Sequence, residues 1–115
     1  MSLKLLRRRP PSVDEAAPAV ATRPSDTIPI AEVTWRSRVK VAGRVRSMRI
    51  QPWAGVATLE CTVVDSTGGL VVVFLGRREV AGIHCGTEVV VEGMVGEHGG
   101  RLAILNPDYD IIPAV

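Results

Sequence analysis

The sequence predicts an all-β protein folded as a small closed barrel of five strands in Greek-key order. One phrase occurs twice, as Val39-x-Val41-x-Gly43-x-Val45 and again as Val89-x-Val91-x-Gly93-x-Val95. Alternating valines indicate a strand with one buried face, and a glycine at the same point of both copies indicates a sharp bend. Small barrels bend their strands at glycines or bulges, whereas a flat sandwich needs no matched bend. The chain of 115 residues has room for one such domain.

A short helical turn is predicted just before the first strand, because Ile30 and Val33 lie at helical spacing after a proline. The first strand itself runs from about 38 to 50. Its valines up to Val45 share one face, whereas Met48 belongs to the opposite parity. This change of phase predicts a bulge, or a crossover between faces, after Val45.

Four more strands are expected after the first. Their approximate ranges are 56–65, 70–75, 88–96 and 101–105. Alternation along 56–65 places Thr58, Glu60 and Thr62 on its outward face. Segment 70–75 is apolar at every position, so both of its faces should be at least partly covered.

The connections between these strands carry turn chemistry. Residues 51–55 are expected to form a turn, and residues 65–69 combine side-chain acceptors with glycines, as in a tight hairpin. Residues 76–86 are too polar and glycine-rich for a long helix, although 77–81 could form a turn or two. Pro107 is expected to end the fifth strand, because proline cannot donate to the ladder.

The N-terminal segment differs in composition from the rest. Residues 1–27 contain four prolines and the run Arg7-Arg8-Arg9, without sustained apolar periodicity. Such a segment cannot bury enough apolar surface to offset its ordering entropy, so 1–27 is predicted to be a disordered basic arm and 28–115 the folded domain. Two roles for the arm stay open, a solvated tail and a contact for a polyanion.

Compartment and cofactors follow from what the sequence lacks. It has no signal-peptide pattern and no apolar stretch long enough to span a membrane, which predicts a cytoplasmic protein without a membrane partner. Cys61 and Cys85 lack the paired spacing of zinc sites and are expected to be buried apolar groups. No metal or other cofactor is therefore expected.

Charge is unevenly distributed along the predicted domain. Residues 28–115 carry nine basic and nine acidic side chains, yet six cations and no acid lie between Arg36 and Arg49. A strand this basic is typical of a surface that contacts a polyanion. The alternative is an ordinary solvated strand whose charges are neutralised by Glu60, Glu92 or Glu97 on neighbouring strands.

Several motifs together resemble the OB-fold nucleic-acid-binding domains, in particular the wedge of branched-DNA helicases and the anticodon-binding module of aminoacyl-tRNA synthetases. The resemblance covers about residues 28 to 112. The motifs that carry it are the two valine–glycine phrases, Val63-Val64-Asp65-x-Thr67-Gly68 and Asn106-Pro107-Asp108-Tyr109. It implies a five-stranded Greek-key OB barrel whose glycines and Asp-x-Thr-Gly turn shape the fold.

The same resemblance implies a binding surface for single-stranded or branched DNA, or RNA, across the second and third strands. Loops after the first and fourth strands would border this surface. The candidate residues carried over by position are Arg46, Arg49, Trp53, Thr62, His98 and Arg101, and the cations Arg44 and Arg77 are added as further candidates. Phe74 is an alternative to Thr62 on the sheet.

Aromatic residues are too few for strong base stacking. The chain has two tryptophans, one tyrosine and one phenylalanine. Of these, Trp35 and Phe74 are expected in the core, and Tyr109 at the barrel end with its hydroxyl bonded to backbone. Binding is therefore predicted to be weak and to depend mainly on phosphates.

Two other functions were weighed against this one. The sequence shows no Ser-His-Asp order, phosphate-binding glycine loop or paired acidic motif, which argues against an enzyme. A module that binds a protein partner, or self-associates through a strand edge, remains the alternative.

Overall fold

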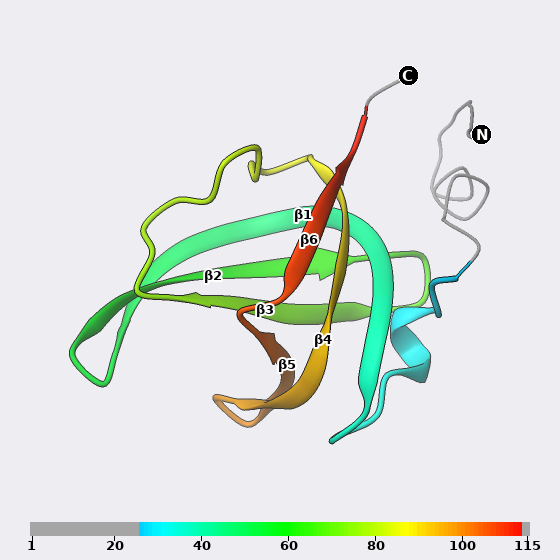
Figure 1. Ribbon diagram of the computed structural model, residues 1–115, viewed down its shortest axis with the longest axis horizontal. Coiled ribbons are helices and arrows are strands. Elements are labelled where there is room, and N and C mark those ends of the chain that lie inside the picture. Colours follow the sequence, from blue (N-terminus) through cyan, green and yellow to red (C-terminus); the bar gives the residue numbers. More distant parts are fainter. Residues whose placement is uncertain (1–25, 114–115) are drawn as a thin grey trace.

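The computed structural model describes residues 26–113, which form an all-β domain with a single 3-10 turn (Figure 1). Of the predicted arm, only Asp26 and Thr27 fall within the described residues. The elements in chain order are η1 (Ile30–Glu32), β1 (Arg38–Trp53), β2 (Val56–Val64), β3 (Gly69–Leu75), β4 (Glu88–His98), β5 (Arg101–Leu105) and β6 (Asp108–Ile112). No helix in this part of the chain has the length and apolar character of a membrane crossing.

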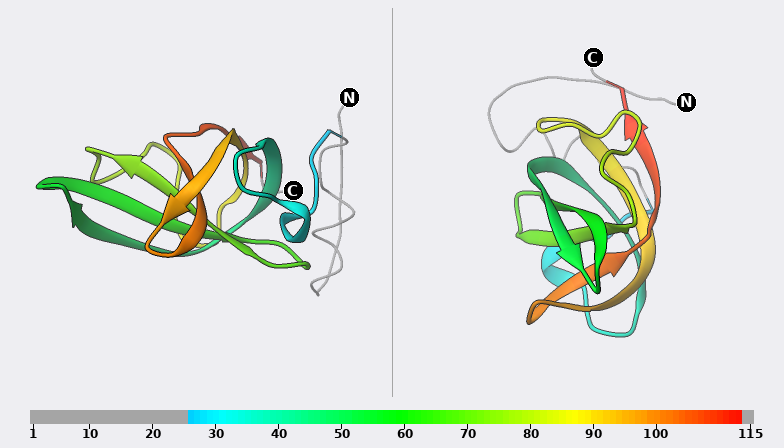
Figure 2. Two further views of the ribbon diagram at one scale, coloured as in Figure 1. Left: turned by 90° about the horizontal axis from the view of Figure 1, so that it is seen from below. Right: turned by 90° about the vertical axis from the view of Figure 1, so that its left-hand side faces the viewer.

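Five of the strands close into a barrel, as predicted. Neighbouring strands follow the order β1-β2-β3-β5-β4, and β4 pairs again with β1 to complete the ring. The β3–β5 pairing is parallel and the other pairings are antiparallel. The long β1 curves around the barrel, so that its first half lies beside β4 and its second half beside β2 (Figures 1 and 2).

The two copies of the repeated phrase pair with each other where the barrel closes. Val41 lies opposite Val91, and the glycine of each copy lies opposite the first valine of the other. A Cβ atom at Gly43 would lie 2.5 Å from the Val64 carbonyl oxygen, and one at Gly93 would lie 2.7 Å from Ile104 Cγ2. Neither glycine has a positive φ. Both are therefore required by close approach between strands.

The predicted bulge is present in β1. The β1–β2 register shifts between Val45 and Ser47, which leaves Arg46 as the extra residue. The shift lets Val45 and Met48 both contact the core despite their opposite parity. The Val45 backbone bonds instead to the loop before β4, donating to the Thr87 carbonyl at 2.9 Å and accepting from the Gly86 N–H at 2.7 Å.

The predicted end of β1 is wrong, and a sixth strand was not predicted. β1 continues to Trp53, because Ala54 and Gly55, with φ values of 52° and 80°, reverse the chain in two residues. β5 ends at Leu105 before Pro107, as predicted, but the sequence did not predict β6. After Asn106, with a φ of 48°, and Pro107, the chain pairs with the first half of β4.

Residues 76–87 form an irregular connection without a helix, so the helical turns considered for 77–81 are absent, although the Ile83 N–H closes a turn onto the Val80 carbonyl at 3.0 Å. Val80 and Ile83 of this connection are buried in the core cluster and cover one end of the barrel. Tyr109 packs edge-on against Phe74, with ring centroids 5.9 Å apart, and its hydroxyl donates to the Ala81 carbonyl. The roles predicted for Phe74 and Tyr109 are thus confirmed.

The predicted helical turn exists as η1 and covers the other end of the barrel. Ile30 and Val33 are buried in the core cluster, and Pro29 occupies the N-cap position. Asp65, which lies in the connection between β2 and β3, holds η1 in place, because its Oδ2 accepts a hydrogen bond from the Ile30 N–H at 2.9 Å. Ala31 donates in the same way to Thr67 Oγ1 at 3.0 Å. The Asp-x-Thr-Gly sequence therefore anchors the segment that precedes β1.

Two expectations about burial are wrong. Trp35, predicted in the core, is 56% exposed because η1 fills the barrel end with Ile30 and Val33 instead. Cys61 is buried as expected, whereas Cys85 lies exposed in the connection before β4.

Candidate nucleic-acid interface

Glu60 lies at the centre of the surface on which the sequence places its candidate residues. It projects from β2 to the side opposite the core, as predicted, but it is only 6% exposed. Burial was not expected for an outward position. Glu60 is buried because the β4–β5 hairpin covers it and places His98 Nε2 2.6 Å from Glu60 Oε2.

The Glu60 carboxylate bonds to two candidate residues at once. Arg49, directly opposite on β1, donates from Nε to Oε1 at 3.2 Å, while His98 occupies Oε2. The His98 side chain is itself only 10% exposed. Burial alone raises the pKa of Glu60, but the hydrogen bonds from His98 and Arg49 outweigh it and hold the pKa below its ordinary value. Glu60 is therefore an ionised carboxylate held between two donors.

Apolar residues lie beneath this contact. Because β3 and β5 lie between β2 and β4 in the sheet, the Glu60–His98 bond crosses above them. Val73, opposite Glu60, and Ala103, opposite Gly96, are fully buried there. They form a second small cluster with Val71 on this side of the sheet, so that β3 is covered on both faces as predicted.

Acidic neighbours neutralise most of the basic stretch in β1. Arg38 lies 3.5 Å from Glu92 and 3.7 Å from Asp108, in both cases between nitrogen and oxygen. The remaining two pairs are Lys40–Asp26 at 2.7 Å and Arg44–Glu88 at 3.1 Å. With Arg49–Glu60, four of the six cations have acidic partners. The alternative of a basic strand neutralised by acids on neighbouring strands therefore describes β1 better. Of the three acids expected to neutralise it, Glu60 and Glu92 do so, whereas Glu97 pairs with no cation among residues 26–113.

Five exposed arginines have no acidic partner within residues 26–113. They are Arg36, which stacks on Trp35, and Arg46, Arg77, Arg78 and Arg101. Arg46 is the bulge residue of β1, and Arg101 lies opposite His98 at the start of β5. Arg77 and Arg78 follow β3. Arg78 was not among the residues predicted from the sequence, although an Arg-Arg doublet in a glycine-rich connection indicates an exposed basic site.

The remaining candidates are spread over β1 and β2. Thr62 lies opposite Ser47 on the same outer side as Glu60 and is half-buried. Trp53 is the last residue of β1, and its side chain lies outside what the structure describes. The structure therefore brings together Arg49, His98 and Arg101, while Arg44 and Arg77 lie elsewhere.

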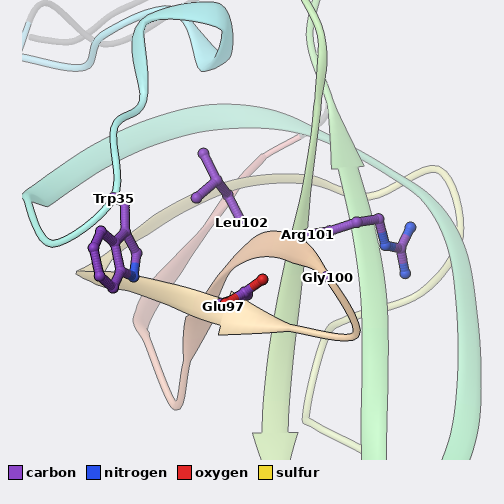
Figure 3. Close-up of a pocket in the computed structure, with 5 residues that line it drawn as sticks. All are labelled: Trp35, Glu97, Gly100, Arg101 and Leu102. Atoms are coloured by element: carbon purple, nitrogen blue, oxygen red, sulfur yellow. The ribbon is translucent and has the colours of Figure 1, made fainter.

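A shallow pocket of about 270 Å³ lies beside the β4–β5 hairpin. Trp35, Glu97 and Leu102 line it, and the Arg101 side chain extends away from these three (Figure 3). The Arg36 guanidinium stacks on the indole at 4.3 Å from the ring centroid. Nowhere in residues 26–113 do three or more His, Cys, Asp or Glu side chains gather as a metal site would require.

Three features together define an OB fold. They are the closed five-stranded ring, the bent first strand, and the β4–β5 hairpin that folds over β2 and β3. Solved structures agree at TM-scores near 0.6. An OBody, AM1L10, bound to hen egg-white lysozyme has a TM-score of 0.60 and 20% identity over 82% of this chain and 98% of that one. A replication factor A related protein from Methanobacterium thermoautotrophicum has a TM-score of 0.59 and 16% identity, over 76% and 92% of the two chains.

RecG bound to a three-way DNA junction is also similar, with a TM-score of 0.58 and 14% identity over 76% of this chain. This chain spans only 12% of the RecG chain. No protein-family model matches the sequence, and no curated protein matches it. At these identities the likeness is one of fold, and the chain is an OB-fold domain.

Proposed function

We propose that this protein is an OB-fold binding module for single-stranded or branched nucleic acid, which it holds weakly and mainly through phosphates. The observation that carries the proposal is the set of five exposed arginines without acidic partners in residues 26–113, on a domain whose other four Lys and Arg side chains are all paired with acids. Guanidinium groups suit bidentate contacts with phosphate oxygens. Two OB-fold proteins of similar structure are named for a replication factor and for a bound DNA junction, which agrees with this partner.

Weak binding follows from the same side chains. Residues 28–115 carry nine basic and nine acidic side chains, so the long-range electrostatic attraction of the domain for a polyanion is small. Phe74 is in the core and Trp35 already stacks with Arg36, which leaves little surface for bases among the aromatic side chains that the structure describes. Phosphate contacts then dominate and make the affinity strongly dependent on salt.

Binding of a labelled thirty-nucleotide single strand to the full chain tests the proposal. We expect micromolar or weaker affinity at low salt, measured by fluorescence anisotropy. The double variant Arg77→Gln/Arg78→Gln should weaken binding about tenfold and lower the slope of log K against log salt by about 1.4, since each phosphate contact to a single strand contributes about 0.7.

Arg38→Gln is the matched control, because Arg38 is already paired with Glu92 and Asp108. It should change the affinity less than about twofold. Equal losses in both variants, affinity that does not respond to salt, or no binding at low salt would each contradict the proposal.

The exposed Trp35 favours a second candidate, self-association through the pocket that Trp35 and Leu102 line. Exposed tryptophans are enriched among the residues that dominate protein interfaces. If nucleic acid is the partner, light scattering should give a monomer mass at every concentration, and Trp35→Ala should leave the affinity for the thirty-mer within about twofold. A stable oligomer that Trp35→Ala converts to monomer would favour the second candidate instead.

A further inference from the structure

Three strands contribute to one ionic cluster on the outer side of the barrel, in which Glu60 and His98 are largely buried and Arg49 is 61% exposed. Arg49 of β1 and His98 of β4 both bond to Glu60 of β2, at 3.2 and 2.6 Å. Two donors converging on one anion at these distances are what a phosphate group also requires. Here the anion is part of the protein.

We propose that Glu60 occupies an anion site formed by Arg49 and His98 and so excludes nucleic-acid phosphates from this part of the barrel surface. The inference rests on the proposed function for the identity of the competing anion. Glu60 is thus a specificity-determining residue that weakens binding by an internal contact.

The competition favours the carboxylate for two reasons. Glu60 is tethered beside its partners, so its effective concentration is far above that of any phosphate in solution. It is also only 6% exposed, and a phosphate that took Arg49 and His98 would leave a buried charge without partners. A phosphate therefore cannot displace it without a large loss of stability.

Arg101 provides the comparison within the same molecule. It lies opposite His98 in the β4–β5 register, is exposed, and pairs with no acid in residues 26–113. If Glu60 excludes phosphates, Arg49, which belongs to the cluster, does not contribute to nucleic-acid binding. Arg101, which lies beside the cluster, does contribute.

The first test compares Arg49→Gln with Arg101→Gln in the full chain, using the labelled thirty-mer at low salt. We expect Arg101→Gln to weaken binding about fivefold and lower the salt slope by about 0.7. Arg49→Gln should change neither quantity beyond about twofold. A loss in Arg49→Gln as large as that in Arg101→Gln overturns the inference.

The second test removes the internal anion. Glu60→Gln keeps the size of the side chain without its charge, and it should tighten binding about tenfold and steepen the salt slope by about 0.7. Adding Arg49→Gln should cancel this gain. Glu32→Gln is the matched control, because Glu32 is exposed on η1, and the same change in net charge there should leave the affinity within about twofold.

Glu60→Thr is a second variant in case the amide is not tolerated, since a β-branched residue suits a strand between Thr58 and Thr62. Circular dichroism confirms that each variant is folded before binding is measured. Wild-type binding with no gain in Glu60→Gln or Glu60→Thr, or a gain that survives Arg49→Gln, overturns the inference alone. If the wild type does not bind but the Glu60 variants do, the inference is supported and the proposed function is contradicted. If neither the wild type nor any variant binds, both are overturned.

Discussion

Gly43→Ala is expected to lower the free energy of unfolding by about 3 kcal/mol or more. The added Cβ would lie 2.5 Å from the Val64 carbonyl oxygen and 2.8 Å from Val63 Cγ1. The first of these atoms is backbone in a strand that pairs with both β1 and β3, so it cannot move without disturbing two ladders. Because small domains are stable by only about 5–15 kcal/mol, a large share of the protein should unfold at moderate temperature.

Gly96→Ala is the control for this prediction. Gly96 also lies in a barrel strand without positive φ, but a Cβ there would meet only Leu105 Cδ1, at 3.8 Å. We expect it to change stability by less than about 0.5 kcal/mol. Gly93→Ala should fall between the two, since its close neighbour at 2.7 Å is the side chain of buried Ile104. Chemical denaturation followed by circular dichroism measures all three, and equal stabilities would refute the explanation given for the repeated glycine.

Asp65→Ala is expected to cost about 3 kcal/mol. Its carboxylate accepts four hydrogen bonds, from the N–H groups of Ile30, Thr67 and Gly68 and from Thr67 Oγ1, at 2.6–3.0 Å. Each is worth about 0.5–1.5 kcal/mol net. Losing them releases both the β2–β3 turn and η1, which covers the barrel end. Ser66→Ala, in the same turn at an exposed position, should change stability by less than about 0.5 kcal/mol.

The same residue makes stability depend on pH. Burial raises the pKa of Asp65, but its hydrogen bonds from Thr67, Ile30 and Gly68 outweigh burial and hold the pKa below the ordinary value of 3.8. A carboxyl with a lowered pKa stabilises the fold above its unfolded-state pKa and loses that contribution as pH falls through its folded-state pKa. Wild-type stability should therefore fall in acid below about pH 4. Asp65→Ala should show a shallower fall, and identical acid profiles would contradict this assignment.

Elements defined by local pattern were predicted well. The valine–glycine phrase gave both closing strands, the parity change after Val45 gave the bulge, and Ile30 with Val33 gave the 3-10 turn. Each depends on residues within one short segment. β6 was missed because Pro107 is locally typical of the end of a strand, whereas pairing resumes at the next residue, Asp108, against β4, which is distant in sequence.

The candidate site was less predictable, because its properties depend on contacts between distant segments. Arg49, His98 and Arg101 were chosen as phosphate ligands by type and position. That two of them are engaged by Glu60 follows only from the folding of the β4–β5 hairpin over β2. Trp35 was predicted in the core because it precedes the first strand, and the space it was expected to fill is taken by η1.

The sequence by itself determined the barrel, its closing strands and the basic character of β1, since strand periodicity, glycine placement and charge are local properties of the chain. Only the tertiary structure decided which cations remain available to a partner. Pairing of β1 with β4 and β2 brings Glu88, Glu92 and Glu60 beside its arginines and lysine. Burial and ion pairing depend on contacts between residues far apart in sequence. The repeated phrase therefore predicts the barrel, whereas only the folded structure determines which charged side chains are paired.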